Sequence, residues 1–290
     1  MNSERIDLDT MKEILDLDDL PLTGNVVIEI LGMLTDKTCK AAELEKVIER
    51  DPGLSAQVLK IANSAFYGLR GNVNSIARAM VLIGMEEVRN VALTVCLMNQ
   101  FRSSSMARSF DSFSFWHHSI MTGLLAREIA DQINLVRGSE AYVMGLLHDL
   151  GILGMASKLA VHYDRISSLE SRRNIVRYEI EKSLTIPHTL VGYWIADRWS
   201  LPEVLKETIL WHHEPLEGEK FVAESALIHV ADLITTQADH MESSEQMSDL
   251  LDTEIFSRVG MDSEILADLF SLKVNMEKEV RGLSAVLGSA

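Results

Sequence analysis

A histidine–aspartate pair, His148–Asp149, ends an apolar segment that begins at Tyr142. Imidazole nitrogens and carboxylate oxygens are ligands for divalent metal ions, so this pair is a candidate metal-binding site. Without a cysteine nearby, iron, manganese and zinc are the ions we expect. Two such ions would bridge a water molecule and neutralise a phosphate under attack, which is the chemistry of phosphoester hydrolysis. Further residues of the same two types are spread along the chain at His118, His188, His212, His213 and Asp232.

These side chains meet only if several helices bring them together, because one helix face presents two or three ligands at most. His118 lies near the start of one expected helix, His148–Asp149 at the end of a second, and His188 near the start of a third. His212–His213 closes a fourth expected helix, and Asp232 lies within a fifth. On spacing alone, a shared metal site and unrelated packing are equally good explanations.

Isolated histidines in a helical protein are more often surface or packed residues than ligands. We therefore expect ordinary structural roles for His162, His229 and His240. His117 and His118 are adjacent, and neighbouring positions on a helix point about 100° apart, so only one of them is expected to face the site.

Helical periodicity runs through nearly the whole chain, and clean alternation of apolar and polar residues is absent. The pattern predicts an all-α fold of two packed helical bundles, residues 19–101 and 114–238. An acidic segment, 1–18, precedes the bundles, and C-terminal helices in 239–290 follow them. Phe101–Phe113, which contains three consecutive serines, is the candidate hinge. The acidic tail is expected either to pack on the bundles or to act as an interaction arm.

Composition narrows the classes of function. The net charge of −16 and pI of about 5.0 argue against nucleic-acid binding, which requires a basic surface. Two cysteines, Cys39 and Cys96, cannot form a disulfide framework, so a reducing, cytoplasmic location is expected. The sequence has no apolar run long enough to span a membrane.

Several short motifs together resemble those of the HDOD domain, an HD-related output domain of bacterial signalling proteins. The order His118, His148–Asp149, Asp232 is similar to the ligand order of the HD phosphohydrolase superfamily, and His188 and His212–His213 resemble the extended set of HD-GYP phosphodiesterases. The resemblance covers about residues 18–238 and also selects His118 rather than His117 as the ligand. The motifs are Leu20-Pro-Leu22, Asp51-Pro-Gly-Leu-Ser55, Leu59–Gly68, Ser75–Ala79 leading into Ile83-Gly84, Phe115–Ser119, Gly145–Gly151, Trp199–Pro202 and Trp211–Pro215.

The chain departs from the HD-GYP pattern where an enzyme handles its substrate. Those enzymes carry a phosphate-binding lysine directly after the His-Asp-x-Gly run, but this chain has Ile152. Ser114 stands where some of them place a bridging glutamate, and the Gly-Tyr-Pro segment is missing after His213-Glu214. Lys158, two helical turns beyond Ile152, is the one candidate for a substitute cation.

The resemblance therefore implies a non-catalytic regulatory module that binds signalling proteins, such as sensor kinases or cyclic dinucleotide enzymes. A divalent metal (Fe, Mn or Zn) held by the seven ligands is compatible with this function. The alternative is a metal-dependent phosphohydrolase in which Asp149 bridges two ions. Asn63, Phe66 and Tyr67 are the predicted partner contacts, and we expect substitution of Asn63 or Phe66 to impair partner binding more than folding.

Overall fold

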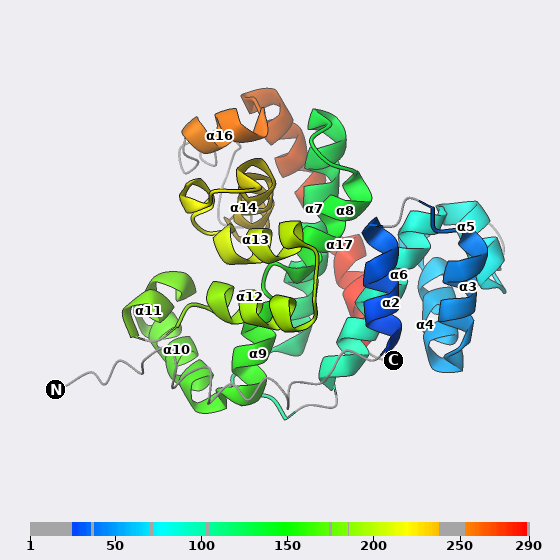
Figure 1. The fold of residues 1–290 in the computed structure, drawn as a ribbon, viewed down its shortest axis with the longest axis horizontal. Helices are drawn as coiled ribbons and strands as arrows, with labels where there is room; N and C mark the ends of the chain where they lie inside the picture. Colours follow the sequence, from blue (N-terminus) through cyan, green and yellow to red (C-terminus); the bar gives the residue numbers. More distant parts are fainter. Residues whose placement is uncertain are drawn as a thin grey trace.

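The computed structural model describes residues 25–35, 38–69, 72–102, 105–173, 176–184, 186–237 and 253–288. Every regular element in these ranges is helical, as the periodicity predicts, and none is a strand. The helices form two bundles with a long C-terminal helix beside them (Figure 1).

Within the described ranges, the first bundle contains five α-helices and one short 3-10 helix. Side-chain caps fix where two of them begin: Asp51 accepts hydrogen bonds from the backbone N–H groups of Gly53 and Leu54, and Ser75 accepts one from that of Arg78. Such caps satisfy backbone donors that have no partner inside the helix. The elements are α2 (Asn25–Thr35), α3 (Ala41–Glu49), α4 (Pro52–Ala62), η2 (Ala65–Tyr67), α5 (Ile76–Ile83) and α6 (Met85–Arg102).

The second bundle is built around α7, which packs against both α8 and α14. Asp111 caps α7 by accepting hydrogen bonds from the backbone of Phe113 and Ser114, so the serine-containing segment before it ends at a defined helix start. The helices are α7 (Ser112–Ile133), α8 (Gly138–Leu147), α9 (Leu150–Lys158), α10 (Ala160–Arg173), α11 (Arg177–Leu184), α12 (His188–Arg198), α13 (Glu203–Trp211), η3 (Pro215–Glu217) and α14 (Val222–Gln237).

The C-terminal helices are α16 (Thr253–Val259) and α17 (Ser263–Gly288). In Figure 1, α17 runs between the two bundles, and it contacts α7 of one and η2, α4 and α6 of the other. Its side chains Leu269, Val280 and Leu283 are buried. The described part of the tail, 253–288, thus packs on the bundles, whereas its acidic stretch from Asp239 to 252 and the N-terminal segment 1–18 lie outside the described residues.

Two helix crossings are too close for any side chain larger than that of glycine. A Cβ atom at Gly145 of α8 would lie 2.7 Å from the Cα of Gly123 in α7. One at Gly151 of α9 would lie 1.8 Å from the carbonyl oxygen of His188 in α12. These two crossings involve the helices that carry or border His118, His148–Asp149 and His188.

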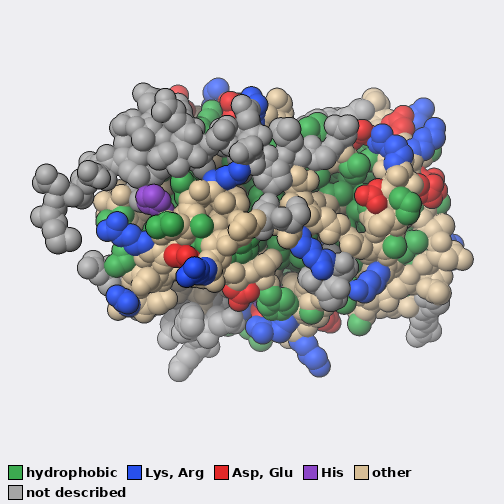
Figure 2. Space-filling view, turned by 90° about the horizontal axis from the view of Figure 1, so that it is seen from below, with side chains coloured by type: hydrophobic (Ala, Val, Ile, Leu, Met, Phe, Trp, Pro, Cys, Tyr) green, Lys and Arg blue, Asp and Glu red, His purple; other side chains and the backbone are tan. Residues whose placement is uncertain are grey.

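On the face drawn in Figure 2, Lys and Arg side chains are scattered among acidic and apolar ones and form no continuous basic patch. No helix in the described ranges is by itself long and apolar enough to cross a membrane. One pair, Gly138–Lys158 with Ala160–Arg172, meets the length and composition only when combined, and it bends by 116° at its junction.

Candidate metal centre

Four of the predicted ligands form one group, which we call the outer group: His118, His148, Asp149 through Oδ2, and Asp232. His118 Nε2 lies 3.2 Å from His148 Nε2 and 3.2 Å from Asp232 Oδ1. Asp149 Oδ2 lies 3.2 Å from His148 Nε2 and 3.6 Å from His118 Nε2. The four side chains come from α7, the α8–α9 junction and α14, so a single site draws on distant parts of the chain.

The remaining histidines form the inner group: His188, His212 and His213, with Asp149 through Oδ1. His188 Nε2 lies 3.1 Å from Asp149 Oδ1 and 3.4 Å from His212 Nε2. His213 offers a ring nitrogen within 4.8 Å of ligand atoms on both His188 and His212. All seven side chains predicted from the sequence therefore lie around one point, and the two oxygens of Asp149 face different groups.

Asp149 lies at the start of a helix, but its carboxylate does not cap that helix and so remains available to both groups. Asp149 is the residue directly before α9, where an aspartate often caps the helix, yet its side chain makes no capping hydrogen bond. His148 directly ends α8. The break between these two helices thus places two adjacent side chains in the same centre.

The imidazole rings are oriented as metal-binding histidines are. His148 Nδ1 donates to the carbonyl oxygen of Gly145 at 2.7 Å, and His212 Nδ1 donates to that of Ile209 at 2.9 Å. Because carbonyl oxygens only accept, the Nδ1 atoms carry protons and the Nε2 atoms are left to face the centre. Two nitrogens bound tetrahedrally to one zinc ion at about 2.0–2.1 Å lie about 3.3–3.4 Å apart, close to the separations found here. The residues therefore fit a divalent metal.

The charges of the ligands shift one another's pKa. Burial lowers the pKa of His148, but the Asp149 and Asp232 carboxylates outweigh burial and raise it to about 9. Burial also lowers the pKa of His188, but the Glu181 and Asp149 carboxylates outweigh burial and raise this pKa to about 10. For Asp149, burial raises the pKa, but His148 and His188 hold it well below its usual range.

The pKa values of His212 and His213 are lowered instead. Burial and the neighbouring His213 lower the pKa of His212 well below its ordinary value, and burial and His188 lower that of His213 to about 4. These two rings are therefore neutral at physiological pH, which is the form that binds a metal.

The structure separates His117 from His118. His117 turns away from the centre, and its Nε2 lies 3.3 Å from Glu277 Oε1 on α17. His229, expected to have an ordinary role, donates through Nδ1 to the backbone carbonyl of His212 at 2.7 Å. It thus helps to hold the backbone of a predicted ligand. His162 is half-buried outside the centre, and His240 lies outside the described residues.

Glu181 on α11 is a site residue that the sequence analysis missed. It is fully buried, and its Oε2 accepts from His188 Nδ1 at 2.6 Å and from the His188 backbone N–H at 2.8 Å. The one available signal was a glutamate on the same helix face as the buried Tyr178, four positions from Arg177. A single charged residue on a short helix ordinarily faces solvent, so this signal is weak.

Ile152 stands at the sequence position of the phosphate-binding lysine of HD-GYP enzymes. Ile152 packs, partly buried, against the apolar core. Lys158 ends α9 nine residues after Asp149, about 13 Å along the helix axis at 1.5 Å per residue, which is beyond the reach of its side chain. Ser114 donates its hydroxyl to Asp111 Oδ2 at 2.7 Å and serves the start of α7.

The predicted partner contacts lie elsewhere, around η2. The Asn63 amide nitrogen donates to the carbonyl oxygens of Leu59 and Val73, both at 2.8 Å, and its Oδ1 accepts from the Val73 N–H at 2.8 Å. These bonds close the 63–73 loop on itself. Asn63 therefore has a structural task, and its role in partner contact stays a prediction.

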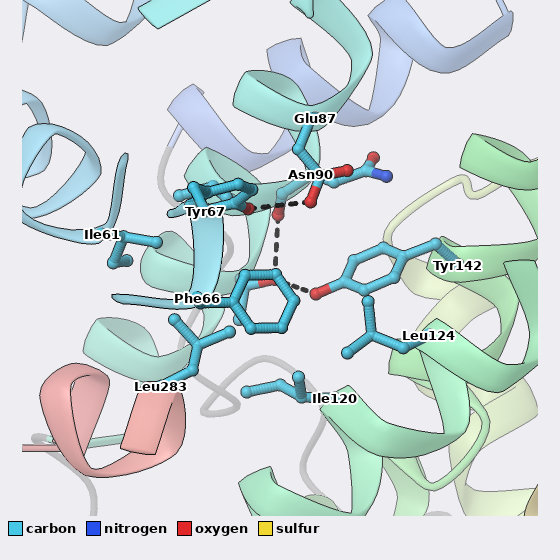
Figure 3. A pocket seen from close by; sticks show the side chains of 11 residues that line it. Ile61, Phe66, Tyr67, Glu87, Asn90, Ile120, Leu124, Tyr142 and Leu283 are labelled. Atoms are coloured by element: carbon cyan, nitrogen blue, oxygen red, sulfur yellow. Dashed lines mark hydrogen bonds between the residues drawn. The ribbon is translucent and has the colours of Figure 1, made fainter. Parts of the chain in front are cut away.

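Phe66 and Tyr67 point inward rather than outward. Figure 3 shows the Phe66 ring over a small pocket between Tyr142 and Leu283, which come from α8 and α17. The cavity measures about 20 Å³, room for about one water molecule. Tyr67 donates its hydroxyl to Glu87 Oε1 at 2.8 Å. Their part in partner contact is likewise still a prediction, with only partly exposed side chains to support it.

One known protein is similar in sequence to most of this chain. An uncharacterized protein of Treponema pallidum (strain Nichols) is 23% identical over 269 residues, which cover 91% of this chain and 51% of that protein. This chain thus spans about half the length of that relative.

Solved structures share the fold. An HDOD domain protein of unknown function from Geobacter sulfurreducens is 24% identical, with a TM-score of 0.81 covering 96% of this chain and 99% of that one. A "Putative phosphohydrolase" from Shewanella amazonensis SB2B is 22% identical, with a TM-score of 0.77 covering 96% of this chain and 97% of that one. At these identities the likeness establishes the fold alone.

The family follows from the sequence itself. The model of the HDOD domain matches residues 20–215, which is more than half of the chain and includes six of the seven converging side chains. It also spans the Asn63–Gly68 loop. The chain belongs to the HDOD domain family.

Proposed function

We propose that this protein is a non-catalytic regulatory module of bacterial signal transduction that holds a divalent metal centre and acts by binding other signalling proteins. The observation that carries the proposal is an asymmetry at one site. The ligands around Asp149 are complete and oriented, whereas the position of the phosphate-binding cation holds Ile152. A branched alkyl side chain cannot replace a positively charged side chain that binds a phosphate.

A bound metal would give this module a charge-neutralising and rigidifying core. The inner and outer groups place three carboxylates, including that of Glu181, against five histidines within the second bundle. The acidic and the basic side chains of this centre come from different helices. The centre therefore links α7, α8, α9, α12, α13 and α14. Iron, manganese and zinc suit the nitrogen and oxygen ligands.

The second candidate is a metal-dependent phosphohydrolase. One observation favours it: Asp149 presents one oxygen to each group, as a carboxylate that bridges two ions would. Two bound ions would supply an activated water and neutralise phosphate charge. The chain would then have to orient the phosphoester without a lysine near Ile152.

An assay of the metal-loaded protein separates the two candidates. The full chain is reloaded with Mn²⁺, Fe²⁺ or Zn²⁺ in turn and incubated with cyclic dinucleotides and with a generic phosphodiester. The regulatory proposal expects no turnover above that of Asp149→Ala. Turnover that Asp149→Ala abolishes would establish the hydrolase instead.

Partner binding needs its own test. The tagged wild-type chain and the tagged His148→Ala variant are used to capture proteins from the native cell, and captured proteins are identified by mass spectrometry. The proposal expects a signalling protein, such as a kinase or a cyclic dinucleotide enzyme, to be enriched by the wild type and confirmed with purified components. Failure of every enriched protein to bind as a purified component would contradict it.

A further inference from the structure

We infer that Glu181 is a positioning residue that makes the inner group the tighter of the two metal-binding groups. This inference rests on the proposed metal centre and concerns how its two halves differ. Glu181 does not reach the ligand point itself. It acts through His188, the ligand that it contacts.

Three of the histidines, His148, His188 and His212, have different hydrogen-bond partners at Nδ1. His148 and His212 each donate Nδ1 to a backbone carbonyl, which is a neutral acceptor. His188 donates instead to the Glu181 carboxylate, at 2.6 Å. A charged acceptor strengthens the hydrogen bond and raises the electron density that the opposite ring nitrogen offers to a metal. Of these three, His188 is thus expected to be the strongest donor.

Glu181 also fixes the position of His188 in the chain. The same Oε2 atom accepts the backbone N–H of His188 at 2.8 Å. That N–H belongs to the first residue of α12 and has no partner within the helix. One oxygen atom therefore holds both the start of α12 and the ring that projects from it, so the ring has little freedom to leave the centre.

Arg177 holds Glu181 from the far side. Its Nη1 lies 3.7 Å from Glu181 Oε1, and its Nη2 lies 3.0 Å from Glu170 Oε2. The guanidinium also stacks over the ring of Tyr163 at 4.5 Å. Arg177 therefore lies on the side of Glu181 away from His188 and places a positive charge at ion-pair distance from this buried carboxylate.

Exposure differs between the two groups in the same direction. In the inner group the side chains of His188 and His212 are 2% and 0% exposed and His213 is partly buried. In the outer group His148 is fully buried, but His118 and Asp232 are 24% and 14% exposed. Water competes less for a metal in a covered site. A carboxylate-backed histidine and a covered position together favour retention of an ion in the inner group and exchange in the outer group.

The experiment measures metal affinity and not activity. The full chain is stripped with a chelator, and Zn²⁺ binding is followed by competition with a chromophoric chelator. Wild type is expected to show a tight and a weaker class of site. His213→Ala should abolish the tight class and Asp232→Asn the weak one, which assigns each class to a group.

Glu181→Gln keeps the size of the side chain and removes its charge. We expect about a 10–100-fold loss of affinity in the tight class and no change in the weak class. Glu179→Gln is the matched control, because Glu179 lies on the same helix and is exposed; it should leave both classes unchanged. If Glu181→Gln proves too unstable to purify, Arg177→Met, which keeps the carboxylate and removes its brace, should weaken the same class.

The outcomes are distinguishable. Unchanged tight binding in Glu181→Gln, or a loss confined to the class that Asp232→Asn abolishes, overturns the role of Glu181 and leaves the metal centre standing. Absence of any Zn²⁺ binding by the wild type overturns the metal centre itself. As a second readout, the visible absorption of bound Co²⁺ should change in Glu181→Gln, because the ligand field of His188 changes.

Discussion

Asp149 Oδ1 lies 3.1 Å from His188 Nε2, although the two residues come from different helices. The contact depends on how closely α9 and α12 cross. Gly151, two residues after Asp149, lies directly against the backbone of His188, and Gly192 lies one turn further along α12. The glycine of the His-Asp-x-Gly run is thus the reason that the aspartate reaches the histidine.

Gly151→Ala is expected to separate these helices. The added methyl would stand 1.8 Å from the His188 carbonyl oxygen, so the helices must move apart. Overpacking of this kind costs about 1–3 kcal/mol of unfolding free energy, and here it should also weaken metal binding. Chemical denaturation and Zn²⁺ titration measure the two effects.

Gly282→Ala is the control for this substitution. Nothing lies within 4 Å of a Cβ atom at Gly282, so alanine should stabilise α17 by about 0.5–1 kcal/mol and leave metal binding unchanged. Equal behaviour of the two variants would mean that the close crossing at Gly151 is not required.

Metal binding should release protons. His148 and His188, with pKa values raised to about 9 and about 10, are protonated at neutral pH in the metal-free chain, whereas a metal ligand must be neutral. Zn²⁺ affinity should therefore rise with pH throughout the range below about 9, which titrations at about pH 6, 7 and 8 sample. Calorimetry in buffers of different ionisation enthalpy measures the number of protons released; a value of zero would contradict the protonated state of both histidines.

The metal-free chain should show the opposite dependence. Since both histidines have folded pKa values above their ordinary 6.5, they contribute stability fully below about pH 6.5, and this contribution is lost as the pH rises through about 9 and 10. The unfolding midpoint of the stripped protein should fall over that interval. In His148→Ala the fall should be smaller, because one of the two groups is gone.

Asn63→Ala is expected to lower the free energy of unfolding by about 1–3 kcal/mol. The substitution removes three hydrogen bonds and leaves the Val73 N–H without its acceptor. This is a larger effect on folding than the sequence suggested for a partner-contact residue. Asn74→Ala, at an exposed neighbouring position, should be neutral in the same denaturation experiment; equal effects would contradict the loop-closing role.

Glu87 connects the two bundles. It accepts from the Tyr67 hydroxyl at 2.8 Å and from Arg127 Nη1 of α7 at 2.7 Å. Glu87→Gln should weaken this connection, because hydrogen bonds to a charged group are worth about 1.5–3 kcal/mol, less where water screens them. Hydrogen exchange should accelerate in residues 65–67.

The neighbouring Glu86→Gln is the control for Glu87. Its side chain is 50% exposed and lies 3.7 Å from Arg137, so removal of its charge should leave exchange in residues 65–67 unchanged. The same acceleration in both variants would mean that η2 responds to net charge and not to the Glu87 contacts.

Much of this structure could be predicted from the sequence because its signals are local. Asp51, Ser75 and Asp111 mark helix starts through short-range capping, and the seven predicted ligands are recognisable by residue type. What could not be predicted depends on how helices cross. The support of His188 by Glu181 depends on such packing and carries no sequence pattern of its own.

The inward orientation of Phe66 has the same origin. An aromatic residue in a Gly- and Asn-rich loop looks exposed, but α17 and α7 supply the apolar partners Leu283 and Ile120 from far along the chain. His117 likewise finds Glu277 only because α17 folds back on α7. Long-range partners of this kind become visible only in the folded chain.

The central claim is that the residues around Asp149 bind metal without hydrolysing a phosphoester. Its most direct test is to measure bound metal and phosphodiester turnover on one sample of the reloaded full chain, with Asp149→Asn beside it. The account predicts that the wild type retains metal, that Asp149→Asn retains less, and that neither turns over substrate. Metal-dependent turnover by the wild type that Asp149→Asn abolishes, or no metal retained by the wild type, would contradict it.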